Sequence, residues 1–214
     1  MLQLLLDSLS DSAYLDLSGE PLLKRPALVS PLAGWKAYPL RLLARLDGCG
    51  FHVELQLEVG YSSTCPCSAT LARQLIQARF REDFAGGELE YAAVLEWLGG
   101  SEGIPATAHS QRSVARLHLR LDAGLAQLPG RELVGRAERA LGTALQTAVK
   151  CADEQAFALA NGQNLMFCED AARRLQGAFA GAPGVRGFNL AVVHAESLHA
   201  HDAVASSRWS RAGD

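Results

Sequence analysis

Two cysteines separated by one proline, Cys65-Pro66-Cys67, are the first residues of this sequence that could do chemistry. Thiolates act as nucleophiles and bind borderline-soft metal ions. The proline restricts the segment, and Cys67 stands just before a predicted helix, where free backbone N–H groups and the helix dipole favour a thiolate. Two structural thiols in a loop explain the same short motif equally well, so C-x-C alone does not identify a site.

Three further segments carry side chains suited to chemistry. His109 stands at the start of a predicted strand and is followed by Gln111 and Arg112, which suits a metal ligand beside an anion-binding guanidinium. Glu154 and Glu169 stand near predicted helix starts, where a carboxylate can bind a metal or accept a pair of N–H groups. The helix dipole favours acidic residues there in any case. Taken alone, each segment also fits an ordinary loop or helix start.

The densest polar cluster is ESLHAHD, residues 196–202. On a strand, His199 and His201 would face the same side, and in a loop either imidazole can reach a metal ion. Glu196 is placed to act as an acid or base beside such a metal. One thiolate, two imidazoles and one carboxylate together suit Zn²⁺, Fe²⁺ or Mn²⁺, but these groups are far apart in the sequence and spacing alone does not bring them together.

The elements that must position these residues are predicted from hydrophobic periodicity. Alternating apolar residues over 40–46 and 51–59, joined by a turn at 47–50, predict an antiparallel hairpin with one buried face. Helices are predicted over 1–9, over 69–81 with Ser68 as N-cap, up to Trp97, over 131–148 and after Glu169. Strands are predicted over 111–121 and 186–195, with a short segment near 202–206. Hairpins with separate helices indicate an α+β protein built on an antiparallel sheet.

Composition narrows the class of protein. The chain has 214 residues, of which 49% are hydrophobic and 20% charged, as is typical of a soluble globular protein. Its net charge of -3 gives no reason to expect nucleic-acid binding, and no apolar run reaches the roughly 18 residues of a membrane span. Five cysteines with one close pair do not suggest a disulfide framework, which favours a reducing cytoplasm.

Five motifs resemble those of the type IB GTP cyclohydrolase family, in the family's order and over almost the whole chain. They are YSSTCPCS (61–68), HSQRS (109–113), DEQAF (153–157), NLMFCEDAAR (164–173) and ESLHAHDAVA (196–205). The combination is highly specific, and it outweighs the simpler explanation available for each motif alone.

The resemblance implies the tunnelling fold, in which antiparallel sheets carry helices on one face and assemble into a barrel-like homo-oligomer, expected to be a tetramer with active sites near subunit contacts. It implies one domain over residues 1–206, made of two related halves, and a loose polar tail over 207–214. It also implies conversion of GTP and water to 7,8-dihydroneopterin triphosphate and formate, the first step of folate biosynthesis. Family members usually carry further N-terminal strands before the region matching Leu2, so these strands are expected to be missing here.

The resemblance also assigns roles to residues. A divalent metal (Zn, Mn or Fe(II)) is expected to be held by Cys65, His109, Glu154 and His199. Cys67 is expected to be the active-site thiol near the purine C8, and Glu196 to assist proton transfer. Glu169 is expected to anchor the guanine edge. Further candidates for substrate binding are Gln111, Arg112 and His201.

Other functions stay open from the sequence. A related cyclohydrolase forming a cyclic-phosphate pterin would share these motifs, and a non-catalytic purine- or pterin-binding protein would share the fold. A thiol redox protein using Cys65 and Cys67 would not need the His and Glu clusters. Ala108 stands where close relatives carry proline, which gives the loop before His109 more freedom.

Overall fold

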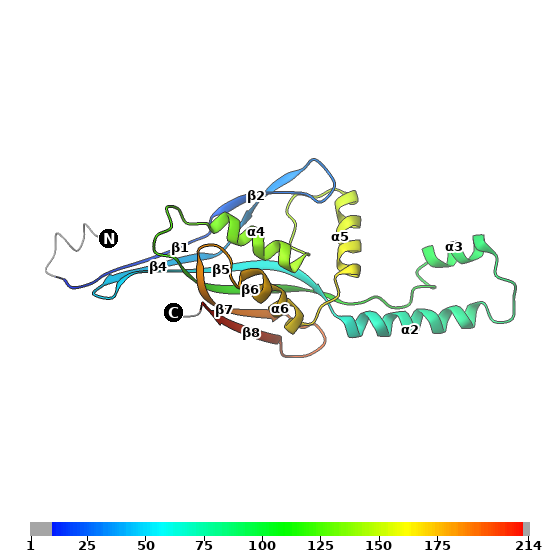
Figure 1. Ribbon diagram of the computed structural model, residues 1–214. Helices are drawn as coiled ribbons and strands as arrows, with labels where there is room; N and C mark the ends of the chain where they lie inside the picture. Colours follow the sequence, from blue (N-terminus) through cyan, green and yellow to red (C-terminus); the bar gives the residue numbers. More distant parts are fainter. Residues whose placement is uncertain (1–9, 212–214) are drawn as a thin grey trace.

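A six-stranded antiparallel sheet forms the centre of the computed structural model, which describes residues 10–211 (Figure 1). Its strand order is β1-β4-β5-β6-β7-β8. The strands are β1 (Ala13–Gly19), β4 (Leu40–Asp47), β5 (Gly50–Thr64), β6 (Ser110–Leu121), β7 (Val185–His194) and β8 (Ala203–Ser210). A separate hairpin pairs β2 (Leu22–Pro26) with β3 (Ala33–Ala37). The predicted α+β class with an antiparallel sheet is confirmed, whereas the helix predicted over 1–9 lies outside the described residues.

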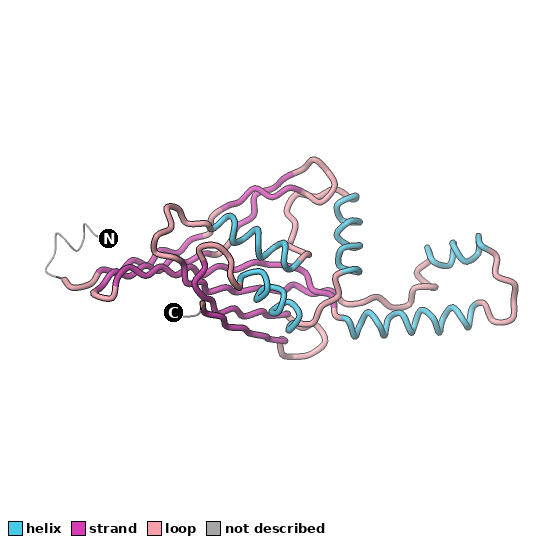
Figure 2. Tube along the Cα trace, in the orientation of Figure 1, coloured by secondary structure: helices cyan, strands magenta, loops and turns pink. Residues whose placement is uncertain are grey.

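Two helices, α4 (Gly130–Leu141) and α6 (Cys168–Phe179), cover one face of this sheet (Figures 1 and 2). Successive side chains of a strand point to opposite faces, so Leu55 and Val59 of β5 and Leu117 of β6 point to the helices and are buried. Leu175 of α6 belongs to the same core. The helices therefore lie on one face only, as the tunnelling-fold resemblance implies.

The hairpin predicted from the alternating residues is β4–β5, with Leu46 opposite Phe51. The second strand does not stop near residue 59 but continues to Thr64. Its last four residues, 61–64, are all buried. This extension carries the chain directly into the Cys65-Pro66-Cys67 motif.

The helix predicted over 69–81 is α2 (Pro66–Asp83), and its N-cap is Cys65 rather than Ser68. Proline suits the first helical position because the N–H that it lacks has no partner there. Ser68 lies inside the first turn, where its Oγ accepts a hydrogen bond from the backbone N–H of His109 (2.9 Å). The prediction of Ser68 as N-cap is wrong, and its hydroxyl instead joins α2 to the second motif.

The helix predicted over 131–148 ends earlier, at Leu141. Gly142 follows in the left-handed conformation (φ 81°), the usual C-terminal stop of a helix. Asn164 caps this end, since its Nδ2 donates to the Leu141 carbonyl (2.8 Å). Thr143 then lies beside β5, accepting from the backbone N–H of Ser62 at 2.8 Å. The apolar periodicity beyond Leu141 therefore reflects packing against the sheet, not helix.

The C-terminal part of the chain is more ordered than predicted. The short segment near 202–206 is the full strand β8, which pairs with β7 from His194↔Ala203 to Gly187↔Ser210. The expectation of a loose tail from Ser207 is therefore wrong as far as Ser210. No helix within residues 10–211 is long and apolar enough to cross a membrane.

A helical arm, formed by α2 and α3 (Tyr91–Gly99), projects beyond the end of the sheet (Figures 1 and 2). Phe80 and Phe84 of α2 contact Trp97 of α3, with ring centroids 5.2 and 6.0 Å from that of Trp97. The indole Nε1 of Trp97 also donates to Asp83 Oδ2 (2.8 Å). This small aromatic cluster holds the two helices of the arm together.

Candidate active site

Two of the five motifs are joined residue by residue at one end of the sheet. Residues 61–64 of β5 pair with 110–113 of β6, from Tyr61↔Ser113 to Thr64↔Ser110. Beyond the ladder, the backbone N–H of Cys65 donates to the carbonyl of His109 (3.3 Å). The first two predicted metal ligands are therefore brought next to each other by strand register, although 44 positions separate them in the sequence.

Two more motifs lie at the same end of the sheet. The backbone N–H of Ala195, just after β7, donates to the carbonyl of Arg112 (3.3 Å), which places Glu196 beside the start of β6. The backbone N–H of Met166 donates to the carbonyl of Thr64 (3.2 Å), which places the start of α6 beside the end of β5. Four motifs thus converge around the last residues of β5.

Hydroxyl groups, of which those of Ser63, Thr64 and Ser113 are buried, connect these strand ends. Ser63 Oγ lies 2.7 Å from Ser113 Oγ, and Thr64 Oγ1 lies 2.6 Å from Ser110 Oγ. Thr64 Oγ1 also lies 3.5 Å from Asn161 Oδ1 of α5 (Cys151–Gln163). These hydroxyl contacts tie the end of β5 to the start of β6 beside the motif residues.

Glu196 is held by its own loop. Its Oε1 accepts from the backbone N–H groups of Ser197 (3.0 Å) and Leu198 (3.2 Å), and its N–H donates to Asp202 Oδ1 (3.0 Å). The hydrogen bond from Leu198 is the main reason that the pKa of Glu196 lies below its usual value; His109 and His199 lower it further. The carboxylate is therefore ionised at neutral pH and lies within electrostatic reach of both imidazoles.

The predicted site residues differ in their exposure to solvent. His199 and His201 stack with ring centroids 5.4 Å apart in the loop between β7 and β8. Cys65, His109, Gln111 and Glu196 are partly buried, whereas Cys67, Arg112, Glu169, His199 and His201 are exposed. Glu169 lies in the first turn of α6. Solvent-borne substrates can therefore reach the predicted substrate-binding groups directly.

Glu154 does not join this cluster within one chain. It is exposed in the first turn of α5, whereas Asn161, seven residues later, is the residue of α5 that contacts Thr64. A rise of 1.5 Å per residue separates the two by about 10 Å along the helix axis. Within residues 10–211, no three His, Cys, Asp or Glu side chains are grouped so that they could hold a metal ion. The four-residue ligand set stays a prediction.

A buried pair below the site was not predicted from the sequence. His194 Nε2 lies 2.8 Å from Tyr61 Oη, and both side chains are at most 4% exposed. Burial lowers the pKa of His194 and raises that of Tyr61, so both are neutral at neutral pH. Glu169 and Glu196 also act on His194 electrostatically. The two residues lie on different strands, so only the strand register brings them together.

The variant Tyr61→Phe is expected to destabilise the protein because it leaves a ring nitrogen of His194 buried without a partner. An unsatisfied buried polar group costs about 1–3 kcal/mol. Thermal unfolding of the purified variant measures the effect as a lower Tm. Tyr14→Phe is the matched control, since Tyr14 is 62% exposed on β1. An equal Tm for both variants would show that the pair contributes no stability.

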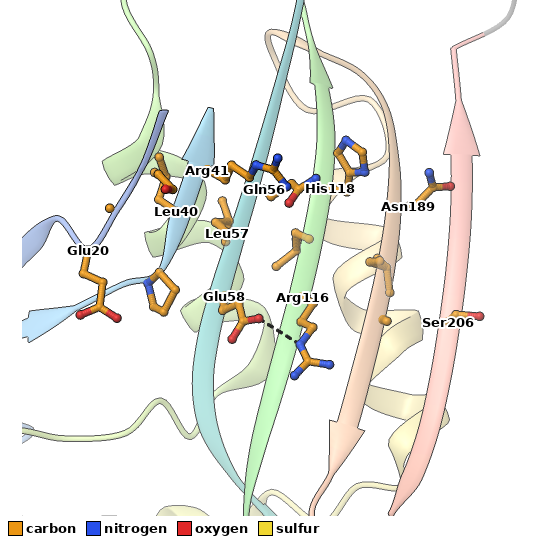
Figure 3. Close-up of a pocket in the computed structure, with 16 residues that line it drawn as sticks. Glu20, Leu40, Arg41, Gln56, Leu57, Glu58, Arg116, His118, Asn189 and Ser206 are labelled. Carbon is orange, nitrogen blue, oxygen red and sulfur yellow. Dashed lines mark hydrogen bonds and ion pairs between the residues drawn. The ribbon is translucent and has the colours of Figure 1, made fainter. Parts of the chain in front are cut away.

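A cavity of about 740 Å³ lies away from the motifs, on the face of the sheet that the helices do not cover (Figure 3). Gln56, Glu58 and His118 line it, and an ion pair joins Arg116 Nε to Glu58 Oε1 (3.0 Å). None of the predicted site residues belongs to its lining. This cavity is therefore separate from the end of the sheet at which four of the motifs converge.

Comparison with known proteins assigns the family. The sequence model of the type I GTP cyclohydrolase FolE2 family matches residues 1–205. The chain belongs to this family. The GTP cyclohydrolase FolE2 of Pseudomonas putida (strain GB-1) is 62% identical over 202 residues, covering 94% of this chain and 67% of that protein. The FolE2 of Chromohalobacter salexigens is 60% identical over 204 residues, covering 95% of this chain and 67% of the relative.

The resemblance of the five motifs to this family is thereby confirmed, and the chain spans about two thirds of the length of these two FolE2 relatives. Among solved structures, a uricase from Arthrobacter globiformis is similar with a TM-score of 0.46 at 6% identity, over 95% of this chain and 64% of the uricase.

Proposed function

We propose that this chain is a GTP cyclohydrolase I that converts GTP and water to 7,8-dihydroneopterin triphosphate and formate, the first step of folate biosynthesis. Membership of the FolE2 family supports this activity. The proposed location of the active site rests on the convergence of Cys65, His109 and Glu196 at one end of the sheet. These are a thiol, an imidazole and a carboxylate, the groups that a metal-assisted hydrolysis needs.

The proposal includes a divalent metal held by Cys65, His109, Glu154 and His199. The donor chemistry fits, because sulfur, imidazole nitrogen and carboxylate oxygen together suit Zn²⁺, Mn²⁺ or Fe²⁺. Cys65 and His109 are adjacent through their backbones, and His199 lies near enough to influence the pKa of Glu196. When bound, such a metal lowers the pKa of a water molecule and supplies a nucleophile for C8 of the purine.

The remaining roles fall to exposed or partly exposed side chains. Cys67, in the first turn of α2, presents its exposed thiol to the purine C8. The ionised Glu196 accepts and returns protons during ring opening. Glu169 accepts paired N–H groups of the guanine edge. Arg112 and His201 are proposed as further substrate contacts, with the Arg112 guanidinium directed to phosphate.

We also propose that the protein is a homotetramer in the cytoplasm. Active sites near subunit contacts would allow the exposed Glu154 of one copy to approach the site of another. All five cysteines, which lie within the described residues, are free thiols, as a reducing compartment requires.

Incubation with GTP tests the proposal. Purified protein loaded with Mn²⁺ or Zn²⁺ is expected to release formate and to yield a fluorescent pterin after oxidation, while protein treated with a chelator yields none. Chromatography then separates the linear triphosphate from a cyclic phosphate. A fully metal-loaded protein that forms no pterin would refute the activity for this chain.

A further inference from the structure

The side chain of Gln111 lies between two residues of the proposed site. Gln111 is partly buried in β6, opposite Ser63 of β5. When its amide is oriented with the nitrogen toward its neighbours, Nε2 lies 3.3 Å from His109 Nδ1 and 3.2 Å from Glu196 Oε1. The same nitrogen lies 3.2 Å from the carbonyl oxygen of Ala195. The opposite orientation places the amide oxygen against two other oxygens, which is repulsive.

These contacts complete a continuous path across the site. The Ser68 hydroxyl, one residue after Cys67, accepts from the backbone N–H of His109. Gln111 continues from the His109 ring to the Glu196 carboxylate, whose loop leads to His199. The Gln111 amide therefore joins two motifs, 109–113 and 196–205, and the Ser68 hydroxyl joins the first of these to the motif at 61–68.

The chemistry of an amide suits this position. A neutral imidazole has one N–H and one bare nitrogen, so Nδ1 accepts from Gln111 when the proton lies on Nε2. If Nε2 becomes the bare nitrogen, Nδ1 carries the proton, and the amide oxygen accepts it only after a half-turn that places this oxygen against Glu196 Oε1 and the Ala195 carbonyl oxygen. Glutamine at this position therefore favours the His109 tautomer with the proton on Nε2. Glutamate can only accept, and methionine does neither to a useful extent.

We propose that Gln111 is a positioning residue that fixes the His109 ring and the Glu196 carboxylate relative to each other, rather than a group that binds GTP. This inference rests on the proposed function, in which His109 holds the metal and Glu196 transfers protons. Partners that orient a metal-binding histidine typically change metal affinity or activity 10–100-fold when they are removed.

The first test compares Gln111→Met with Gln176→Met, which removes a side chain of the same type from the exposed side of α6, where it accepts from Ser207 Oγ. Gln111→Met is expected to lower kcat for GTP about 10–100-fold with KM changed less than about twofold. The control should retain both constants. A large rise in KM at unchanged kcat would overturn the proposal, since it would place Gln111 in contact with substrate.

A double-mutant cycle tests whether Gln111 acts through Glu196. In the Glu196→Gln background, Gln111→Met is expected to lower kcat much less than in the wild type, because the carboxylate that it positions is already gone. Independent, multiplicative effects would overturn the proposal. If Glu196→Gln itself retains wild-type kcat, the role of Glu196 in the proposed function fails, and this cycle reports that failure separately.

A third test does not depend on catalytic activity and uses the metal-free protein. The ¹⁵N resonances of the His109 ring in wild type are expected to show Nδ1 as the bare nitrogen, and Gln111→Met should shift the tautomer ratio. Gln176→Met should leave the ratio unchanged. An unchanged His109 spectrum in a Gln111→Met variant with wild-type Tm would overturn the link between these side chains, whether or not the protein turns over GTP.

Discussion

Replacing Cys67 with alanine is expected to reduce GTP turnover by on the order of 10³-fold or more, while metal content and Tm stay close to wild type. The thiol is exposed in the first turn of α2, so its loss removes no packing. Cys168 cannot replace it, because it is buried and its Sγ donates to the carbonyls of Val192 and Ala203. Initial rates together with elemental analysis of bound metal measure both parts of the prediction.

Two other cysteines provide controls for this variant. Cys65→Ala is expected to lose the metal as well as the activity, because Cys65 is the proposed thiolate ligand. Cys49→Ala, in the exposed turn between β4 and β5, should retain full activity. Loss of metal in Cys67→Ala with retention in Cys65→Ala would show that the roles of the two cysteines are reversed.

The variant Asp153→Asn is expected to lower the Tm by roughly 5–10 °C. Asp153 Oδ1 accepts from the backbone N–H groups of Val29 and Ser30, both at 2.8 Å. Its Oδ2 accepts from the backbone N–H of Lys150 at 2.9 Å. An asparagine would turn its NH₂ group toward one set of these donors. The carboxylate therefore fastens the β2–β3 loop to the start of α5, beside Glu154.

The contribution of the Asp153 carboxylate to stability depends on pH because its pKa is shifted in the folded protein. Hydrogen bonds from Ser30, and then those from Lys150 and Val29, hold the pKa of Asp153 far below its ordinary value of 3.8. Because the folded-state pKa is depressed, the carboxylate stabilises the fold fully above about pH 4 and progressively less as the pH falls below that value. Thermal melts from pH 7 to pH 3 should show that the difference in Tm between wild type and Asp153→Asn narrows in acid.

Asp16→Asn is the control for this effect. Asp16 on β1 pairs with Arg41 of β4 at the surface, where water screens the interaction. Its replacement should change the Tm little at any pH in this range. If Asp16→Asn lowers the Tm as much as Asp153→Asn does, the loss of any carboxylate destabilises the protein. The buried backbone contacts of Asp153 would then not explain the effect.

The parts of the fold that the sequence predicts well are those set by local pattern. Alternation over 40–59 identifies β4 and most of β5 because one face of these strands is buried. The last residues of β5, 61–64, are a tyrosine followed by small hydroxyl residues, and only pairing with β6 makes them a strand. The end of α4 depends on a cap from Asn164, which lies 23 positions after Leu141. No local pattern contains such a contact.

The candidate site was likewise predicted only in part from the sequence. Motif order identifies the residue types, and strand register then brings Cys65 to His109 and Glu196 to the start of β6. The link through Gln111 and the pair Tyr61–His194 require side chains from separate strands to meet, which spacing alone does not predict. Glu154 was expected with the other ligands, but α5 holds it at the far end of the helix from Thr64 within one chain.

The helical arm has a mechanical consequence for the thiol at its base. α2 has 18 residues, so it is a rod about 27 Å long whose pivot contains Cys65 and Cys67. A tilt of about 10° at the pivot moves the far end by roughly 5 Å. Conversely, a restraint on the tip near Phe84 and Trp97 limits the angular freedom of the whole rod. The orientation of Cys67 toward the proposed position of the purine is therefore sensitive to forces applied a full helix length away from it.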